Sequence, residues 1–454
     1  MGWPAHRCPP APAGQDSGGD GLRLRGAVPS GGAGAVRAGG RARPDRPRAA
    51  QVTVTASVPP RVPHVTQPTD GGVAPRVLHV TQPTDGGVAV CVESVCADQS
   101  RRGWAVAVAA PPGGRLGERL AALGLPHLPW PAVRAPRPAD LAAVVALSRI
   151  VRRFRPDVVH LHSSKAGLAG RVALRGRVPT VFQPHGWSWL ACRGPLAAAT
   201  AAWERAAARW AHLVVCVGTG EARQAEDAGL RGPLTVVRNG VDLTRFPPAG
   251  QDRREAARRA LGLDTGGPLV VCVGRITRQK GQDLLVDSWR QVAARLPDAR
   301  LALVGDGDDF DHVRSAAPPD VLMPGASADP RPWYAAADLV ALPSRWEGLP
   351  LTALEAMATG RSVVAAAVPG LVEVVTPDTG ALVGPEDPAA LAAAVLDRLT
   401  VPSLRHAEER AARSRAAEFD LASTLDRLAA HTLRLARPPH PADATATEVT
   451  AGPG

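Results

Sequence analysis

The 454-residue sequence has few of the features that mark secreted, membrane-spanning or disulfide-bonded proteins. No apolar run reaches the roughly 18 uncharged residues that a membrane-spanning helix needs, and no compact apolar stretch follows a basic start, so a secretory signal is not expected. The six cysteines form no CxxC pair, which favours buried free thiols in a reducing compartment. We therefore expect a cytoplasmic protein, with peripheral contact at the inner face of the membrane left open.

Lysine is nearly absent, because the chain contains 51 arginines and only two lysines, Lys165 and Lys280. The heavy use of Ala, Gly and Pro suggests a composition shaped by GC-rich coding, in which arginine serves wherever any cation is adequate. A retained lysine then either marks a position that requires a compact ammonium group rather than a planar guanidinium or is retained by chance.

Positive charge is concentrated in the first part of the chain. Residues 75–240 carry a net charge of +11 and residues 1–74 carry +5, whereas residues 241–437 carry −3. The sequence has no aromatic interleaving, helix-turn-helix spacing or zinc pattern, so nucleic acid is not an expected partner. The excess of positive charge is better explained by a face that rests on an anionic membrane or receives an anionic acceptor. The remaining alternative is that GC-rich coding supplies surplus arginine.

Alternating strand-like and helical segments predict an α/β protein with two doubly wound domains. Strand-like runs cover 76–81, 104–110, 157–162, 179–183 and 213–217, and then 268–274, 299–305, 338–343 and 362–367. Helical periodicity covers 88–102, 138–154, 195–211, 281–296, 349–359, 388–399, 403–417 and 421–436. Such alternation implies parallel sheets covered on both faces, with ligands at the carboxyl ends of the strands.

The first 74 residues are interpreted as a disordered basic tail rich in Pro, Gly and Arg. Within it, the segment 60–74 recurs at 75–89 with a single difference. Only the second copy leads into a strand followed by a helix, so we expect the ordered chain to begin near Arg76.

The first candidate site is a pair of cations at a strand-to-helix junction. Gly274 and Arg275 end a strand-like run, and Lys280 follows five residues later at the start of a helix. Backbone N–H groups and the helix dipole at such a turn attract anions, and two added cations make a cradle for a diphosphate. Neither GxxxxGK[ST] nor GxGxxG is present, which excludes a P-loop and a dinucleotide fingerprint.

The second candidate site is a pair of glutamates around another strand-to-helix junction. Glu347 lies in the segment SRWEGLP and Glu355 follows eight residues later. On a helix this spacing would separate their backbones by about 9–12 Å, whereas retaining hydrolases need carboxyl groups about 5–5.5 Å apart. The two carboxylates could instead hold opposite ends of an extended ligand.

Five segments together resemble the retaining GT-B glycosyltransferases of family 4. They are GR-x4-K at 274–280, EGLPL with a second glutamate at 347–355, RNGVDLTRF at 238–246, LVGDGDD at 303–309 and His-Gly at 185–186. The resemblance runs from about residue 76 to 437 and implies two Rossmann-like domains that face each other across a cleft.

With this resemblance the chain divides into five parts. They are the tail 1–74, an N-terminal acceptor domain 75–245, a C-terminal nucleotide-sugar donor domain 246–420, a closing helix 421–437 that returns to the N-terminal domain, and a disordered tail 438–454.

The resemblance also implies a role for each candidate residue. Glu355 would hold the ribose, Glu347 the sugar hydroxyls, and Arg275 with Lys280 the diphosphate. Gly348 and Leu349 would belong to the same donor site, where amides near Gly348 would stabilise charge on the leaving oxygen. Gly86 and Gly87 would face the same phosphates from the N-terminal domain. His185 would position the transferred sugar, and together with Glu347, Arg275 and Lys280 it makes up the expected catalytic set. No cofactor or metal is expected, because the two cations would do the work of a metal.

Three further segments are assigned with less direct support. Ser163, Ser164 and Lys165 resemble a stretch of family members that build polysaccharides or glycolipids, and are predicted to contact the acceptor. His160 and His162 alternate along a strand and are assigned to opposite faces, which argues against a metal pair. The segment 306–308 looks like a DxD metal motif, but it matches the glycine turn of family 4 and is interpreted as a turn.

These predictions describe a retaining glycosyltransferase that moves a sugar from a UDP- or GDP-linked donor to a glycan, lipid-linked or small-molecule acceptor. One alternative is a nucleotide-sugar epimerase of the same architecture. The other is a catalytically silent protein that binds glycans or nucleic acid.

Overall fold

Residues 74–133, 140–263 and 266–436 are described by the computed structural model of the protein. The two tails predicted from the sequence and the first copy of the repeat therefore lie outside the described residues, except for Ala74.

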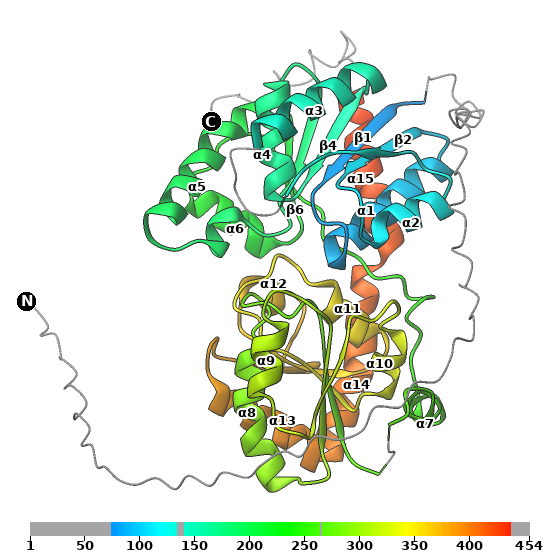
Figure 1. The fold of residues 1–454 in the computed structure, drawn as a ribbon. Coiled ribbons are helices and arrows are strands. Elements are labelled where there is room, and N and C mark those ends of the chain that lie inside the picture. The colour runs from blue at the N-terminus through cyan, green and yellow to red at the C-terminus, as the bar shows by residue number, and fades with distance from the viewer. Residues whose placement is uncertain (1–73, 134–139, 264–265, 437–454) are drawn as a thin grey trace, which may run out of the picture. The chain divides into compact units, whose positions relative to one another are not determined.

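Seven parallel strands form the first sheet, in the order β3-β2-β1-β4-β5-β6-β7 (Figure 1). They are β1 (Arg76–Thr81), β2 (Ala105–Ala110), β3 (His127–Pro129), β4 (Val158–His162), β5 (Thr180–Gln183), β6 (Leu213–Cys216) and β7 (Leu234–Val236). The central strands β4 and β5 are buried along their whole length, as strands covered by helices on both faces must be. The strand order reverses between β1 and β4, which is where doubly wound folds bind their ligands.

Helices cover both faces of the first sheet. They are α1 (Gly86–Arg101), α2 (Arg115–Ala122), α3 (Asp140–Phe154), α4 (Ser163–Leu174), α5 (Gly194–Ala207) and α6 (Thr219–Asp227), with 3-10 turns at Ser188–Ala191 and Ala208–Trp210. One apolar cluster joins α3 and α4 to the sheet and contains Ala166 and Phe182. A second joins α1 and α2 to the sheet and contains Val92 and Leu116. A Cβ atom at Gly167 would overlap the Phe182 ring, so glycine allows α4 to lie close to the sheet.

Six parallel strands form the second sheet, in the order β10-β9-β8-β11-β12-β13. They are β8 (Leu269–Val273), β9 (Arg300–Val304), β10 (Val321–Gly325), β11 (Leu339–Leu342), β12 (Ser362–Ala366) and β13 (Gly380–Val383). The order of this sheet reverses between β8 and β11, so its switch point lies at the carboxyl ends of these two strands.

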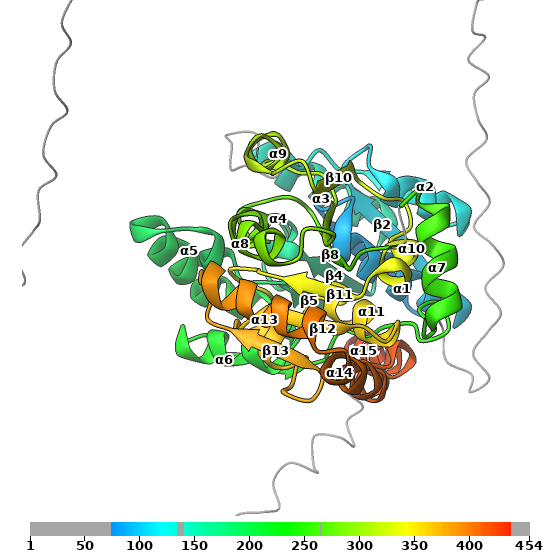
Figure 2. The same cartoon turned by 90° about the horizontal axis from the view of Figure 1, so that it is seen from below.

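The helices of the second domain lie on both faces of its sheet (Figure 2). They are α7 (Gln251–Ala260), α8 (Gln282–Arg295), α9 (Phe310–Ala316), α10 (Arg331–Ala336), α11 (Leu351–Ala358), α12 (Pro369–Val372), α13 (Pro388–Thr400) and α14 (Pro402–Ala416), with a 3-10 turn at Ala417–Phe419. Trp289 of α8 and Leu391 of α13 belong to one apolar cluster. Tyr334 of α10, Met357 of α11 and Ala412 of α14 belong to the other.

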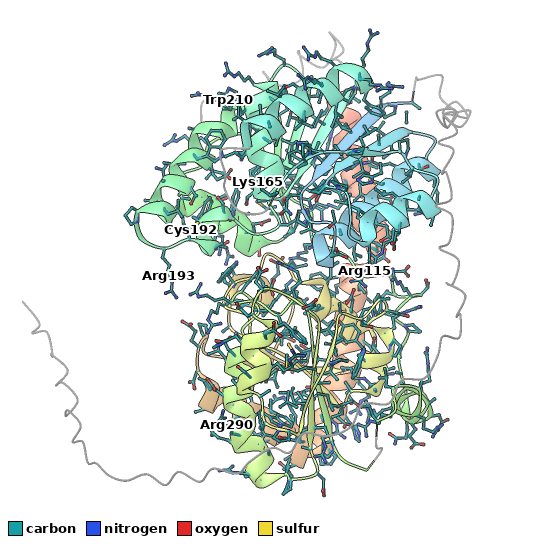
Figure 3. The ribbon with its side chains drawn as sticks, viewed as in Figure 1. Arg115, Lys165, Cys192, Arg193, Trp210 and Arg290 are labelled. Atoms are coloured by element: carbon teal, nitrogen blue, oxygen red, sulfur yellow. The ribbon has the colours of Figure 1, made fainter. Side chains whose placement is uncertain are left out.

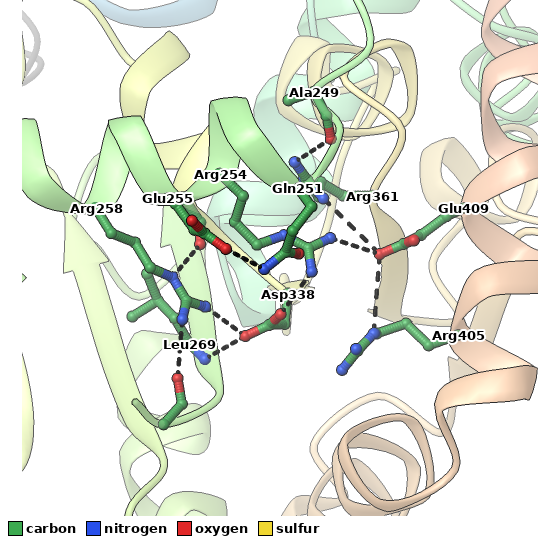
Figure 4. A network of polar contacts seen from close by, with 12 residues as sticks. Ala249, Gln251, Arg254, Glu255, Arg258, Leu269, Asp338, Arg361, Arg405 and Glu409 are labelled. Carbon is green, nitrogen blue, oxygen red and sulfur yellow. Dashed lines mark hydrogen bonds and ion pairs between the residues drawn. The ribbon is translucent and has the colours of Figure 1, made fainter. Parts of the chain in front are cut away.

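A buried network of ion pairs attaches α7 to the second domain (Figure 4). Asp338 accepts from Arg254 at 3.0 Å and from Arg258 at 2.6 Å, and Arg254 also contacts Glu409 at 3.1 Å. The backbone N–H of Leu269, at the start of β8, donates to Asp338 as well. Breaking a buried pair leaves an uncompensated charge and costs about 3–5 kcal/mol, so the network holds the end of the interdomain segment against β8 and β11.

The last helix, α15 (Leu421–Ala436), packs on the first sheet although it follows the second domain in the chain (Figure 1). Leu425 and Leu428 share an apolar cluster with Val158 of β4, and Arg102, which directly follows α1, forms an ion pair with Asp426 at 2.5 Å. The chain therefore crosses between the two domains twice, near residues 239–250 and again near 417–420. No helix in the described ranges is both long and apolar enough to cross a bilayer.

The predicted fold class is confirmed, since the structure has two parallel sheets with helices on both faces. The predicted strands match β1, β2, β4, β5, β6, β8, β9, β11 and β12 to within about one residue at each end. The predicted elements do not include the helices α2, α4, α6, α7, α9, α10 and α12. They also do not include β3, β7, β10 and β13, which are short strands at the sheet edges with few fully buried side chains. Such strands carry little of the apolar signal on which the prediction depends.

Candidate active site

The loop after β8 carries the two cations that were predicted to bind a diphosphate. Gly274 and Arg275 follow β8 directly, and Lys280 precedes Gly281, the N-terminal cap of α8. Gly281 has a φ angle of +71°, and a Cβ atom there would overlap the carbonyl oxygen of Pro343, so only glycine fits. The loop thus places both cations near the positive end of α8.

A glycine turn after β9 packs against this loop. A Cβ atom at Gly305 would overlap the Gly274 carbonyl oxygen, and one at Gly307 would overlap that of Ile276. The Ile276 N–H donates to the Asp306 carbonyl oxygen at 3.0 Å, while the Asp306 carboxylate accepts from the Gly307 N–H. Residues 305–307 therefore form a turn that supports the cation loop, as the sequence predicts for the DxD-like segment.

Glu347 lies in the loop between β11 and α11 and forms an ion pair with Lys280. Glu347 Oε1 is 2.6 Å from Lys280 Nζ and also accepts a hydrogen bond from Ser344 Oγ at 2.7 Å. The side chain of Glu347 is 7% exposed and that of Lys280 is 19% exposed. Because both charges are paired and largely buried, the ammonium group is held at a defined place.

Arg345 fixes this loop to the start of α8, a contact that the sequence analysis missed. Its Nη1 and Nη2 atoms lie 2.9 and 2.7 Å from the Asp283 carboxylate, and its Nε atom lies 2.8 Å from Glu386 Oε1. The hydrogen bonds to Asp283 hold the pKa of Arg345 well above its usual value. Only the fold brings residues 283 and 345 together, so no local sequence signal could have identified the pair.

Glu355 lies on α11 and lines a cavity of about 120 Å³. Tyr334 OH donates to Glu355 Oε2 at 2.8 Å, and burial raises the pKa of Glu355. Glu347 lies before the start of α11, so the eight residues from Glu347 to Glu355 do not all belong to one helix. The backbone distance of about 9–12 Å, which was calculated for a continuous helix, therefore does not apply. Leu351 of α11 also lines the cavity, and further walls come from α1, α15 and the interdomain segment, among them Cys91, Asn239, Arg245 and Leu425.

The first turn of α1 faces the loops of the second sheet. Gly86 has a φ angle of +77°, and a Cβ atom there would lie 3.8 Å from Arg275 Cδ. A Cβ atom at Gly87 would lie 3.9 Å from Leu351 Cδ1. The structure therefore brings Gly86 beside Arg275, at a helix N-terminus that can add backbone N–H groups to an anion site.

His185 follows β5 and lies in a strained turn next to Gly348. Its φ angle is +53°, a conformation that a residue other than glycine adopts at a cost. The N–H of the next residue, Gly186, donates to Glu221 Oε1 at 2.5 Å, and burial raises the pKa of Glu221 to about 7. A Cβ atom at Gly348 would lie 3.3 Å from the Gly186 nitrogen and 2.9 Å from Val217 Cγ2. The His185 turn and the Glu347 loop thus meet.

Leu349 and Asn239 form a further contact between the two domains. Leu349 is 3% exposed, and its carbonyl oxygen accepts from Asn239 Nδ2 at 2.8 Å. Asn239 belongs to the RNGVDLTRF segment, to which the sequence analysis assigned no contact. Arg115 of α2 makes another such contact, because its Nη1 donates to the Ser327 carbonyl oxygen at 2.7 Å (Figure 3).

The three predicted acceptor residues begin α4, directly after β4. Ser163 has a φ angle of +75°, and its hydroxyl oxygen is buried without a hydrogen-bond partner among the described residues. Ser164 and Lys165 are partly exposed in the same turn (Figure 3). Because β4 and β5 are neighbours in the sheet, these residues lie at the same edge as His185.

The prediction that His160 and His162 face opposite sides of their strand is wrong. Their rings stack with centroids 4.0 Å apart, because side chains two residues apart on a strand point to the same face. His162 Nδ1 lies 3.1 Å from His185 Nε2, and His79 of β1 lies on the other side of His162 at 3.0 Å. The histidines of β1 and β4 therefore lie directly behind His185.

Two family models match the chain. The model described as "Glycosyltransferase Family 4" matches residues 85–245, and the one described as "Glycosyl transferases group 1" matches residues 267–400. The first match covers most of the first sheet and its helices, and the second covers the second sheet.

Two characterised relatives carry mannosyltransferase names. The lipopolysaccharide core biosynthesis mannosyltransferase LpsB of Rhizobium meliloti is 39% identical over 181 residues, which are 36% of this chain and 51% of LpsB. A GDP-mannose-dependent monoacylated phosphatidylinositol monomannoside mannosyltransferase of Corynebacterium glutamicum is 36% identical over 188 residues, which are 39% of this chain and 49% of that enzyme. The matched part of the chain thus spans about half the length of each of these relatives.

Solved structures share the fold over nearly their whole length. HepE of Anabaena, solved in complex with UDP and glucose, superimposes with a TM-score of 0.69 at 22% identity and covers 79% of this chain and 99% of HepE. From the two family models, the relatives and this shared fold, we conclude that the chain belongs to the GT-B glycosyltransferases of the family 4 type.

Proposed function

We propose that the protein is a retaining glycosyltransferase that moves a sugar from a UDP- or GDP-linked donor to an acceptor held mainly by the first domain. One observation carries the proposal. Arg275 and the Lys280–Glu347 pair lie at the carboxyl ends of β8 and β11, next to the glycine turn of α1. This arrangement provides two cations and two helix N-termini for a diphosphate, with a carboxylate beside them.

The difficult event in such a reaction is the departure of the nucleoside diphosphate. Negative charge grows on the leaving oxygen while positive charge builds on the sugar. In the proposal, Arg275 and Lys280 stabilise the leaving group, which is the electrostatic contribution that is usually largest in catalysis. Because Glu347 already holds the Lys280 ammonium and Ser344 in turn holds the Glu347 carboxylate, little reorganisation is needed when the bond breaks. We propose that these cations take the part that a metal ion plays in other enzymes.

The two glutamates would bind different parts of the donor. Glu355 lines the cavity beside Leu351, and a carboxylate there can accept hydrogen bonds from the hydroxyls of a ribose. Glu347 lies beside Lys280 at the other side of the diphosphate position, where its carboxylate can accept from sugar hydroxyls. HepE was solved with UDP and glucose, and the C. glutamicum relative is named GDP-mannose-dependent. These names support both UDP-sugars and GDP-sugars as candidate donors.

We extend the proposal to peripheral contact with an anionic membrane through α3. Leu141 and Val145 on this helix are 70% and 41% exposed, and Arg149, Arg152 and Arg153 are exposed on the same helix. Apolar and basic side chains on one helix suit the surface of an anionic bilayer. Co-sedimentation with phosphatidylglycerol vesicles should therefore weaken when Leu141 and Val145 are both replaced by serine. Unchanged binding by this variant would exclude α3 as the contact.

A panel of nucleotide sugars tests the donor proposal. UDP-glucose, UDP-galactose and GDP-mannose should be compared by thermal shift, because a bound ligand raises the unfolding temperature. The same panel is then assayed for release of UDP or GDP, and the product of the best donor is analysed by NMR of its anomeric signal. An α-linked donor that yields a β-linked product would contradict the retaining proposal. Absence of any thermal shift across the panel would contradict the donor site itself.

A further inference from the structure

A line of hydrogen-bonded side chains runs through the interior of the first domain and ends at His185. Gln99 Oε1 of α1 lies 2.9 Å from His79 Nε2, His79 Nδ1 lies 3.0 Å from His162 Nε2, and His162 Nδ1 lies 3.1 Å from His185 Nε2. Gln99, His79 and His162 are at most 1% exposed. None of these three side chains is among the predicted site residues, and we call the four residues the imidazole chain.

The three rings of the imidazole chain meet edge to edge. The ring centroids of His79 and His162 are 5.3 Å apart, and those of His162 and His185 are 5.4 Å apart. In both pairs the centroid separation exceeds the N···N distance by about 2 Å, so each hydrogen bond lies close to the line that joins the rings. Interplanar angles of 21° and 26° keep the rings nearly in one plane. The geometry is that of linear N–H···N hydrogen bonds.

A metal ion does not fit this geometry, although His79, His160 and His162 have ring nitrogens within 4.8 Å of one another. Bonds from zinc to histidine nitrogen are about 2.0–2.1 Å long. Two ring nitrogens that face each other along a line at 3.0 Å leave room between them for a proton and not for such an ion. His160 stacks on His162 and bonds to Gln183 instead, so it stands beside the imidazole chain without interrupting it.

Counting protons along the imidazole chain determines the tautomer of His185. A neutral imidazole has one N–H donor and one acceptor nitrogen, and an amide oxygen can only accept. Gln99 Oε1 therefore requires the proton of His79 on Nε2, which makes His79 Nδ1 an acceptor. His162 must then carry its proton on Nε2, and its Nδ1 accepts from His185 Nε2. His185 is left with Nδ1 as its acceptor nitrogen.

The imidazole chain is closed at its inner end, so it is not a path for protons to the solvent. Gln99 is buried, and its Nε2 atom has no hydrogen-bond partner among the described residues. An imidazolium has two donors and would break the alternation of donors and acceptors. Burial opposes that charge, because it lowers the pKa of His79 and of His185 to about 4. The chain therefore orients His185 and does not exchange its proton.

We propose that Gln99, His79 and His162 are positioning residues that hold His185 in the tautomer with Nδ1 as a hydrogen-bond acceptor. This inference rests on the proposed function and on the role that the family resemblance implies for His185, which is to position the transferred sugar. An acceptor nitrogen at this place selects a hydroxyl group of the sugar as its partner, since only a donor can bind to it. The strained turn at residue 185 then keeps the ring at the end of the chain, where His162 can determine its tautomer.

NMR of the full-length protein with labelled histidine ring nitrogens tests the tautomer directly. In the unaltered protein, His185 should carry its proton on Nε2. Gln99→Leu removes the terminal acceptor, three groups away from His185, and His162→Leu removes the neighbour. Both variants should give a mixture of the two His185 tautomers. The matched control is His160→Gln, which changes a buried histidine of the same strand outside the chain and should leave the tautomer unchanged. A proton on Nδ1 in the unaltered protein, or an unchanged tautomer in both leucine variants, overturns the proposal.

Turnover measurements then test the effect on the reaction, with UDP-glucose and GDP-mannose as probes and release of UDP or GDP as the readout. Gln99→Leu should lower kcat about tenfold with little change in KM, since misplacement of a catalytic group acts on the reacting geometry. A shifted tautomer with unchanged kcat would overturn the catalytic part of the proposal. If the unaltered protein consumes neither probe, the donor proposal fails, whereas the NMR result still decides the imidazole chain.

Discussion

At the scale of single residues, Lys280 is the side chain on which the proposed chemistry depends most. It is one of two lysines in the chain, and its ammonium group lies 2.6 Å from Glu347. Lys280→Ala should lower kcat by about a hundredfold or more, the usual cost of removing one donor that stabilises transition-state charge. Initial rates measure kcat and the unfolding temperature measures stability, so a loss of activity is distinguished from a loss of the fold. Arg290→Ala, which removes a cation from within helix α8, should change neither, and a near-normal kcat for Lys280→Ala would exclude the phosphate role.

The buried histidines predict a loss of stability in mild acid. Burial lowers the pKa of His79 and His185 from 6.5 to about 4, and the pKa of His160 and His162 lies well below 6.5 for the same reason. Because the unfolded chain then binds more protons, the free energy of unfolding should fall as the pH falls from 6.5 toward 4. At about pH 5, His79 and His185 should each cost on the order of 2 kcal/mol. Glu221, with its pKa raised to about 7, acts in the opposite direction, as do Glu204 and Glu355, whose pKa burial also raises.

Urea unfolding between about pH 7.5 and about pH 5 measures this dependence. The variant His79→Gln should show a weaker loss of stability over the same range, since one of the groups that the unfolded chain protonates is gone. Equal pH dependence of the two proteins would contradict the assignment of the effect to the buried histidines.

At the scale of elements, the loop that leads into α11 has to lie against the first domain at Gly348. A Cβ atom at this position would lie 2.9 Å from Val217 Cγ2 and 3.3 Å from the Gly186 nitrogen. Gly348→Ala should therefore push the Glu347 loop away from the His185 turn and raise the KM for a nucleotide sugar about tenfold, because small displacements in an active site are costly. The effect should appear in the KM and not in the unfolding temperature of the domains.

Gly250→Ala is the matched control for this change. Gly250 precedes α7, has a negative φ angle, and has no atom within 4 Å of a built Cβ. The control should behave as the unaltered protein, and equal KM values for the two alanine variants would show that the contact at Gly348 does not matter.

At the scale of the whole molecule, Glu373 connects the two domains most directly. Its carboxylate accepts from Thr219 N at 2.6 Å, from Thr219 Oγ1 at 2.8 Å and from Arg238 Nε at 2.7 Å, and its side chain is 6% exposed. Glu373→Ala leaves these donors without their acceptor and should weaken the contact between the two domains by about 1–3 kcal/mol. The radius of gyration in solution should increase, and addition of UDP should reduce it again if the donor binds between the domains.

Glu386→Ala serves as the comparison for this prediction. Glu386 pairs with Arg345 within the second domain and is 59% exposed, so its loss should not change the radius of gyration. An unchanged radius for Glu373→Ala would mean that other contacts, such as the one between Asn239 and Leu349, are sufficient to hold the domains together.

The sequence by itself determined the core strands, eight of the helices in the described residues and the order of the site segments, because these depend on local patterns. Buried parallel strands are short apolar runs, helices have a period near 3.6 residues, and the loops between them begin and end where these patterns change. The loop with Arg275 and Lys280 and the loop with Glu347 therefore lie where the sequence predicts them, at the ends of β8 and β11. The short edge strands had too weak a pattern to be found.

The tertiary structure alone decided which side chains meet across those loops. The pairing of Lys280 with Glu347 joins residues 67 positions apart in the chain, and the register of β1 against β4 places His79 opposite His160. No local pattern encodes such contacts, since strand order and register follow from packing the whole sheet. The imidazole chain behind His185 exists for this reason. Strand periodicity could have placed His160 and His162 on one face, but only the fold could add His79 and Gln99 to them.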